Sequence, residues 1–335
     1  MTPEPGQSAA VAHRLIPDLV PTADAIERPI IVDQTNISIV VAEAVVVKWL
    51  ESPVTAPHPG VQMLEHLSAV GFAEMPSFHG CEVVDGEVVA LVTGLIAGAV
   101  DGWEWYVDVC TAELDGSGPA ESVAIAERLG AMAARLHDAM AHASDVFPTP
   151  VAPVSLRDEW ERGCDLLVTA RRLVRGELKD RLAARAARIR ATVDELADRR
   201  SVPGQRIHGD LHVGQVLRSG TMIVVTDFDG DPLADAPAGH RLRSPMADLA
   251  SLVQSVDHVG RVVGYRNRAL VEPADALVAE ANDALVASYG RTCPVDDAVL
   301  GPLRTIQELH EHVYAATMLP RWGYVPDRAL AAMYP

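Results

Sequence analysis

Residues 206–232 read RIHGDLHVGQVLRSGTMIVVTDFDGDP and say more about chemistry than any other part of the chain. A carboxylate, Asp210, follows a short run that includes Ile207, and a carboxamide, Gln215, stands five residues further on. A second apolar run then leads directly to Asp227 and Asp229. Carboxylates at matched places in two strand-and-turn units are hard to obtain by chance, so we expect these side chains to carry the function.

The pattern is typical of phosphoryl transfer, in which a base orients an alcohol while an amide and a carboxylate hold Mg²⁺ against the phosphates. The spacing of five between acid and amide matches the protein-kinase catalytic loop. Gln215 stands where Asn is usual, and Asp227-Phe228-Asp229 stands where Asp-Phe-Gly is usual. We therefore predict that Asp210 is the catalytic base and that Gln215, Asp227 and Asp229 are Mg²⁺ ligands.

Two other interpretations of the same residues are open. His208, Asp210 and His212 alternate, so on a strand they would share one face and could hold a transition metal. That interpretation leaves Gln215 and the later aspartates without a role. A purely structural pair of Asp-rich turns is the other alternative.

The segments HGDLHVGQVL (208–217) and DFDGDP (227–232) resemble those of the maltokinase and aminoglycoside-phosphotransferase group, and especially maltokinases and bacterial glucosamine kinases. These are small-molecule kinases with a protein-kinase-like fold. The resemblance implies a bilobal α+β protein: a small β-rich, nucleotide-binding N-terminal lobe over residues 1–93, and a larger helical lobe over 94–335. The second lobe would carry the catalytic loop and the acceptor site, and residues 1–28 would be an appended segment.

Composition supports two lobes and excludes several classes of partner. A chain of 335 residues exceeds one comfortable core. The net charge of −18 argues against nucleic acids and anionic membranes as partners. Four scattered cysteines indicate reduced thiols, the N-terminus lacks a signal-peptide pattern, and the longest apolar stretch (88–100) is too short to span a bilayer. We expect a soluble cytoplasmic protein, either a monomer or a homodimer.

The first hundred residues predict strands at 28–34 and 37–50, a helix at 61–70 and a hairpin at 82–93. This order of elements is that of a kinase N-terminal lobe. Thr93-Gly94 and the small residues that follow form the predicted hinge, and Val92 and Gly94 are expected to contact the nucleotide. The turn at residues 33–38 contains no glycine, so close approach of its backbone to phosphate is harder, and Ser38 is the candidate contact there.

Lys48 is one of only two lysines and lies inside the apolar run AVVVKWL. An ammonium in such a strand is costly unless it has a partner. The resemblance implies that Lys48 reaches the nucleotide phosphates, with Glu65 of the next helix as its ion-pair partner. An edge lysine that reaches solvent and an exposed Glu65 are the alternatives.

The helical half of the chain contains candidates for two roles: residues that hold the catalytic loop in place and residues that bind the acceptor. Asp248 lies in an apolar helix, and the resemblance to the kinase fold implies that it holds the backbone of the catalytic loop. His137 is expected to pack near that loop. Glu308 and Glu311 share a helix face because they are three residues apart. Together with the rings of Tyr106 and Trp322 they would suit a sugar; a solvated acidic face anchored by Trp322 is the alternative.

Taken together, these residues predict an ATP- and Mg²⁺-dependent sugar kinase that phosphorylates the 6-hydroxyl of D-glucosamine. Glu308 is the carboxylate without an obvious counterpart in maltokinases, and an additional carboxylate is what an ammonium group on C2 would require. A maltokinase that forms maltose 1-phosphate and an aminoglycoside phosphotransferase are the alternative enzymes. A pseudokinase that binds nucleotide without turnover is the alternative from another class.

Overall fold

The computed structural model describes residues 3–30, 36–197, 199, 201–230 and 241–335. The chain divides into two compact units. Unit 1 comprises Met1–Val100, His142–Pro148 and Leu217–His240, and unit 2 comprises Asp101–Ala141, Thr149–Val216 and Arg241–Pro335. The sequence placed the boundary after Thr93; the first segment of unit 1 instead ends at Val100, and this unit also takes in Asp227 and Asp229.

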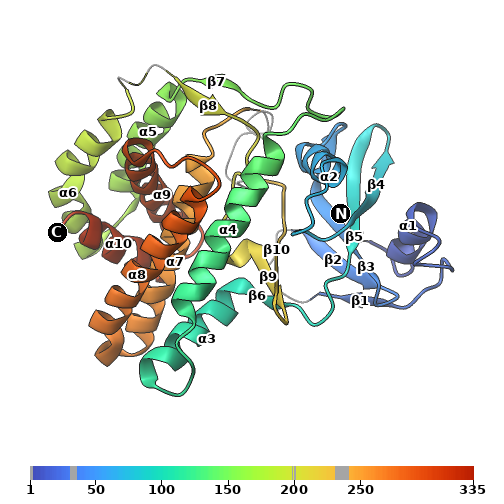
Figure 1. Ribbon diagram of the computed structural model, residues 1–335, viewed down its shortest axis with the longest axis horizontal. Coiled ribbons are helices and arrows are strands. Elements are labelled where there is room, and N and C mark those ends of the chain that lie inside the picture. The colour runs from blue at the N-terminus through green and yellow to red at the C-terminus, as the bar shows by residue number, and fades with distance from the viewer. Residues whose placement is uncertain (1–2, 31–35, 198, 200, 231–240) are drawn as a thin grey trace. The chain divides into compact units, whose positions relative to one another are not determined.

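Unit 1 is built on a five-stranded antiparallel sheet in the order β1-β2-β3-β5-β4 (Figure 1). Its strands are β1 (Glu27–Pro29), β2 (Ile37–Val41), β3 (Val45–Thr55), β4 (Phe78–Val84) and β5 (Glu87–Gly94). Helix α2 (Pro59–Ala69) joins β3 to β4. The predicted hairpin is present as β4–β5, and both residues of its turn, Asp85 and Gly86, have positive φ. Part of the predicted strand 28–34 and residues 33–35 of the predicted phosphate turn lie outside the described residues.

The predicted single strand over residues 37–50 is wrong, because β2 and β3 are two strands of a hairpin. Ala42 and Glu43 form the turn with φ values of 53° and 48°. Glu43 alone interrupts the apolar run VVAEAVVV, and a single polar residue between apolar ones is also usual within a strand, so hydrophobicity does not mark this turn. The third strand also continues beyond the predicted end, to Thr55.

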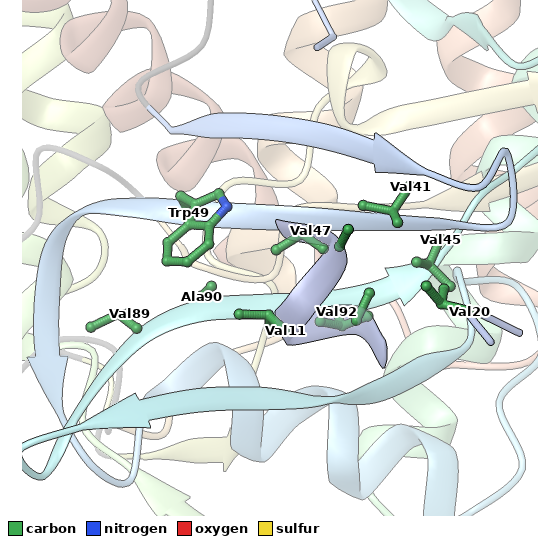
Figure 2. Packing of buried hydrophobic residues seen from close by; sticks show 11 residues of the cluster. Val11, Val20, Val41, Val45, Val47, Trp49, Val89, Ala90 and Val92 are labelled. Atoms are coloured by element: carbon green, nitrogen blue, oxygen red, sulfur yellow. The ribbon is translucent and has the colours of Figure 1, made fainter. Parts of the chain in front are cut away.

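The N-terminal segment forms part of the hydrophobic core of unit 1. Helix α1 (Gln7–Leu15) packs on the sheet, as Figure 2 shows for Val11 against Val47, Trp49 and Val92. The cluster consists of Ala9, Val11, Ala12, Val20, Val41, Val45, Val47, Trp49, Val89, Ala90 and Val92. Since neighbouring residues of a strand point to opposite faces, Lys48 points away from this core.

Unit 2 is mostly helical (Figure 1). Its α-helices are α3 (Gly102–Asp115), α4 (Ser122–Met140), α5 (Arg157–Leu173), α6 (Gly176–Asp194), α7 (Met246–Arg266), α8 (Val271–Gly290), α9 (Asp297–Thr317) and α10 (Tyr324–Met333). Helix α7 is buried along nearly its whole length. Helices α4 and α8 approach closely because Gly130 has no side chain: a Cβ there would lie 2.1 Å from the Leu285 carbonyl oxygen.

Short strands precede and follow the catalytic segment. In unit 2, β7 (Ala152–Val154) pairs with β8 (Val202–Gly204), and a 3₁₀ turn, η1 (Val213–Gln215), follows. The next strands, β9 (Val216–Ser219) and β10 (Met222–Val225), belong to a three-stranded sheet in the order β10-β9-β6, where β6 is Val100–Asp101. The predicted apolar run before Asp227 is therefore a strand. Two further 3₁₀ turns are η3 (Arg268–Leu270) and η4 (Pro320–Trp322). Among the described helices, none combines the length and apolar character needed to cross a membrane.

Candidate active site

Asp248 of α7 holds the backbone of the loop that carries Asp210. Its Oδ2 accepts a hydrogen bond from His208 N (2.7 Å), and its Oδ1 accepts one from Gly209 N (2.9 Å). His137 Nε2 lies 3.1 Å from Oδ2. Burial would raise the pKa of Asp248, but the hydrogen bond and charge of His137 outweigh that effect and lower it. Asp248 is thus an ionised, fully buried anchor, the role expected from the sequence.

Asp210 lies in the anchored loop with Gln215 beside it. Gln215 Nε2 donates a hydrogen bond of 3.2 Å to Asp210 Oδ2, and His212 Nε2 lies 3.7 Å from the same oxygen. Burial would raise the pKa of Asp210, but the contacts with His212, His208 and Gln215 hold it below its ordinary value. Asp210 is therefore ionised at neutral pH and can accept a proton from an alcohol.

The two histidines next to Asp210 shape the loop and do not form a metal site. His208 Nδ1 accepts a hydrogen bond from Asp210 N, and His212 Nδ1 accepts one from Gly214 N. Within the part of the chain that the structure describes, no group of three or more His, Cys, Asp or Glu side chains is placed to hold a metal ion. The alternative of a His208–Asp210–His212 metal cluster is accordingly wrong.

In unit 1, two carboxylates converge on Lys48. The Lys48 Nζ lies 2.6 Å from Asp227 Oδ1 and 2.7 Å from Asp229 Oδ2. Burial would lower the pKa of Lys48, but the charges of Asp229 and Asp227 raise it above its ordinary value, so the lysine stays charged. Asp227 has a φ of 63°, in the left-handed region that non-glycine residues seldom adopt. A cluster of one cation and two carboxylates is thus held at the end of β10.

The predicted ion pair between Lys48 and Glu65 is wrong. Lys48 pairs with Asp227 and Asp229, and Glu65 is an exposed residue of α2. The spacing between a strand lysine and the following helix suggested a local partner. The structure instead supplies the negative charge from residues far along the chain.

The N-terminus of α2 and one residue from the predicted phosphate turn contact Asp229. A Cβ at Gly60 would lie 2.9 Å from Asp229 Oδ1 and 3.0 Å from the Phe228 carbonyl oxygen. Asn36 Nδ2 donates a hydrogen bond of 3.3 Å to Asp229 Oδ2, while Asn36 Oδ1 accepts one from Glu51 N. The sequence placed the backbone of Asn36 in the phosphate turn. It gave no sign of Gly60, or of a contact between the Asn36 side chain and Asp229, because no local pattern links residues so distant in sequence.

The nucleotide residues proposed from sequence are only partly brought together. Ser38 lies opposite Lys48 in the register of β2 and β3, and therefore shares its face of the sheet. Leu91, which the sequence did not suggest, lies opposite Lys48 on β5 and shares that face too. The Val92 side chain instead packs under α1, and the Gly94 N–H is bonded to the Ser77 carbonyl oxygen (2.8 Å). A side-chain contact between Val92 and a nucleotide is therefore not supported.

In unit 2, aromatic rings and a carboxylate surround Trp322. Its Nε1 donates a hydrogen bond of 3.2 Å to Glu311 Oε2. Trp103 packs edge-on against it with ring centroids 5.4 Å apart, and Tyr324 does so at 6.3 Å. Trp103 also borders the catalytic loop, since a Cβ at Gly214 would lie 3.9 Å from Trp103 Cβ. Glu311 and Trp322 are thus brought together as expected, and Trp103 joins them.

Tyr106 and Glu308 do not occupy the positions expected of sugar ligands. Tyr106 is fully buried and its hydroxyl donates to the Ser122 carbonyl oxygen at 2.9 Å, so it is a core residue. Glu308 is also fully buried and its Oε1 accepts a hydrogen bond from His258 Nε2 at 2.7 Å. Both residues lie in segments that do contribute to this cluster. The sequence did not show which aromatic ring of residues 103–106, or which side of α9, is buried in the core.

Residues 51–269 match the model of the phosphotransferase enzyme family, so the chain belongs to that family of enzymes. Two of its relatives are named glucosamine kinase. The glucosamine kinase of Streptacidiphilus jiangxiensis is 37% identical over 328 residues, which cover 92% of this chain and 74% of that protein. The glucosamine kinase of Mycolicibacterium smegmatis is 38% identical over 324 residues, which cover 92% and 79%.

Solved structures agree with this assignment and confirm the predicted α+β, protein-kinase-like fold. A glucosamine kinase crystal structure matches with a TM-score of 0.88 and 31% identity, covering 100% of this chain and 86% of that one. A glucosamine kinase in complex with glucosamine, ADP and inorganic phosphate matches with a TM-score of 0.85 and 32% identity, covering 100% and 84%. The GDP complex of an aminoglycoside 2′-phosphotransferase-IIIa shares the fold, with a TM-score of 0.59 at 14% identity over 98% of this chain and 99% of that one.

The contact between α2 and Asp229 predicts that Gly60→Ala impairs phosphoryl transfer. The new methyl group would have to displace Asp229 Oδ1 or the Phe228 carbonyl oxygen. A displacement of this kind at a reacting centre reduces kcat/KM by about 10- to 100-fold. Steady-state ADP release would measure the effect.

Gly301→Ala is the matched control for this prediction. Gly301 lies in α9, and an added methyl group would meet no atom within 4 Å beyond its chain neighbours and the backbone of its own helix. Activity should be retained, because the substitution touches no residue of the site. Equal activity of the two variants would show that the close contact between Gly60 and Asp229 does not matter for phosphoryl transfer.

Proposed function

We propose that this protein transfers the γ-phosphoryl group of ATP to the 6-hydroxyl of D-glucosamine, giving glucosamine 6-phosphate and ADP. The observation that carries the chemistry is the ionised Asp210, bonded to Gln215 in a loop anchored on Asp248. The choice of acceptor is supported by the relatives named glucosamine kinase and by the structural match to a complex with glucosamine and ADP.

Asp210 acts as the base in this proposal. Its carboxylate accepts a hydrogen bond from the sugar hydroxyl and then the proton, while the hydroxyl oxygen forms a bond to the γ-phosphorus. The bond from that phosphorus to the oxygen that bridges it to ADP breaks, and ADP leaves with the electron pair. The Gln215 amide bonded to one carboxylate oxygen fixes the orientation of the base.

The donor set fits Mg²⁺, and Gln215, Asp227 and Asp229 are the residues proposed to hold it. Asp227 and Asp229 already direct an oxygen each at one cationic centre, the Lys48 ammonium. Carboxylate and amide oxygens are the hard ligands that Mg²⁺ prefers. The ion would neutralise phosphate charge, which matters in a protein of net charge −18. Lys48 is proposed to bind the phosphates, with Ser38 on the same face of the sheet.

Glu311 and Trp322 are proposed to bind the sugar, with Trp103 beside them. An indole face suits the apolar face of a pyranose ring, and a carboxylate suits its hydroxyl or ammonium donors. Trp103 borders both the catalytic loop and Trp322, which supports an acceptor position next to Asp210 within unit 2. A cytoplasmic location is also proposed, supported by the four free cysteines.

The assignment predicts the outcome of an ADP-release screen with Mg-ATP over glucosamine, N-acetylglucosamine, glucose, maltose and several aminoglycosides. Glucosamine should give the highest kcat/KM, and the product should be phosphorylated at O6 by NMR. A higher kcat/KM for maltose or an aminoglycoside would show that the acceptor belongs to that class and not to the amino sugars. Thermal stabilisation by Mg-ATP without ADP release for any sugar would indicate a pseudokinase.

The role of Asp210 predicts that Asp210→Asn lowers kcat by about 10²- to 10⁴-fold, the scale of a positioned base. The amide cannot accept the proton, but it fills the same space. Folding by circular dichroism and the dissociation constant for ATP by calorimetry should stay near wild type. Activity within a few-fold of wild type would show that Asp210 is not the base.

The metal assignment predicts that Asp227→Ala abolishes Mg²⁺-dependent turnover and that Gln215→Ala raises the Mg²⁺ concentration needed for half-maximal activity by at least about tenfold. Calorimetric titration of Mg²⁺ in the presence of ADP should show the same loss of affinity. Asp18→Ala, which removes an exposed carboxylate of unit 1, is the control and should leave the requirement unchanged. Unchanged Mg²⁺ affinity in Asp227→Ala would remove this residue from the ligand set.

A further inference from the structure

A buried ion pair joins α7 to α9 behind the residues proposed to bind the sugar. His258 Nε2 lies 2.7 Å from Glu308 Oε1, and the side chains are 6% and 0% exposed. The second oxygen, Glu308 Oε2, is buried and has no hydrogen-bond partner among the residues that the structure describes. A buried carboxylate with one oxygen unsatisfied is costly, so the positive charge of His258 is its main compensation.

Gln254 contacts the same oxygen of Glu308 as His258 does. Its Nε2 donates to the same oxygen, Glu308 Oε1, and its Oε1 accepts a hydrogen bond of 2.6 Å from Arg304 Nε. Because the arginine can only donate, it fixes which end of the amide faces Glu308. The network therefore runs from Arg304 through Gln254 and Glu308 to His258.

The His258 ring ends this network against Trp322. The two ring centroids are 6.1 Å apart and the planes are nearly perpendicular, at 88°. On its other sides Trp322 contacts Trp103 and Tyr324, and its N–H is bonded to Glu311. Residues of α3, α7, α9 and α10 therefore surround Trp322. Of these residues, His258 is itself held by an ion pair with the buried Glu308.

His258 is positively charged at physiological pH. Burial would lower its pKa, but the charge and hydrogen bond of Glu308, together with the charges of Glu311 and Asp257, raise it to about 9. The ion pair therefore fixes the imidazole ring on Glu308, and the fixed ring packs perpendicular to the Trp322 indole.

We propose that the Glu308–His258 pair is a positioning device for the acceptor site: it holds the Trp322 indole in place and so sets the affinity for the sugar ring without touching the sugar. The proposal rests on the proposed function, because it requires Trp322 to contact the acceptor. It also replaces the expectation from sequence that Glu308 binds the ammonium group directly. A positioning role affects every sugar that uses the indole, whereas a direct contact affects only the amino sugar.

The decisive variant is Glu308→Gln, compared with wild type on glucosamine and glucose. Loss of the carboxylate removes the partner that keeps His258 charged and placed. KM for both sugars should rise by about tenfold, with the ratio of the two KM values preserved. KM for ATP should stay within about twofold, since the change acts on acceptor binding. Calorimetry should show the same loss of glucosamine affinity without any turnover.

Two further variants separate positioning from loss of fold. His258→Gln should reproduce the rise in sugar KM, and the double variant should be no worse than either single one, because both remove the same device. Glu159→Gln is the matched control: Glu159 is also buried, pairs with Arg243 at 2.7 Å and has a second oxygen without a partner among the described residues. It should lower stability and leave the sugar KM unchanged.

Each remaining outcome has a definite meaning. If Glu308→Gln raises KM for glucosamine alone and the preference over glucose is lost, Glu308 contacts the ammonium and the positioning role is overturned. If sugar KM is unchanged in Glu308→Gln, or changes equally in Glu159→Gln, the proposal fails while the kinase assignment stands. If the wild-type protein phosphorylates neither sugar and binds neither in calorimetry, the proposed function itself fails.

Discussion

The catalytic centre depends on the buried carboxylate of Asp248, which accepts hydrogen bonds from two backbone N–H groups. His208 N and Gly209 N, immediately before Asp210, both donate to it. An ionised group at 1% exposure is tolerated only when its hydrogen bonds are made. Asp248 therefore defines the conformation of the loop, because any other backbone arrangement would leave the charge unsatisfied. His137 completes this arrangement, and its Nδ1 lies 2.8 Å from the Tyr289 hydroxyl of α8.

One face of α7 connects this anchor to the rest of unit 2. Ser255, seven residues after Asp248, accepts a hydrogen bond of 3.0 Å from Val213 N in the catalytic loop. His258, three residues further, contacts Trp322. Residues at these spacings lie along one side of a helix. The loop with the base and the indole proposed to hold the sugar are thus positioned by a single rigid element, which links the geometry of the chemistry to that of acceptor binding.

In unit 1, the sheet carries a charged lysine, Lys48, in an apolar strand. This sheet buries an apolar face under α1 and leaves the opposite face for Lys48. A lysine there, 21% exposed, requires anionic partners, and Asp227 and Asp229 provide them. The same two carboxylates are suited to a divalent cation, so one cluster of charges serves both stability and the proposed binding of Mg²⁺ and phosphate. In a protein of net charge −18, a bound Mg²⁺ together with Lys48 would supply the positive charge that an anionic nucleotide requires.

Local signals in the sequence were sufficient to single out Asp210 and Gln215 by their spacing, Lys48 by its place in an apolar run, and the β4–β5 hairpin by its turn. The anchoring role of Asp248 was expected only from the resemblance to the kinase fold. Tertiary packing alone decided which partner each charge meets. Lys48 pairs with Asp227, which is 179 residues away, and not with nearby Glu65. Glu308 is turned inward to His258, and Trp103, not Tyr106, faces Trp322. A helix period predicts that residues share a face, but only the packing of distant helices and strands determines whether that face meets the core or the site.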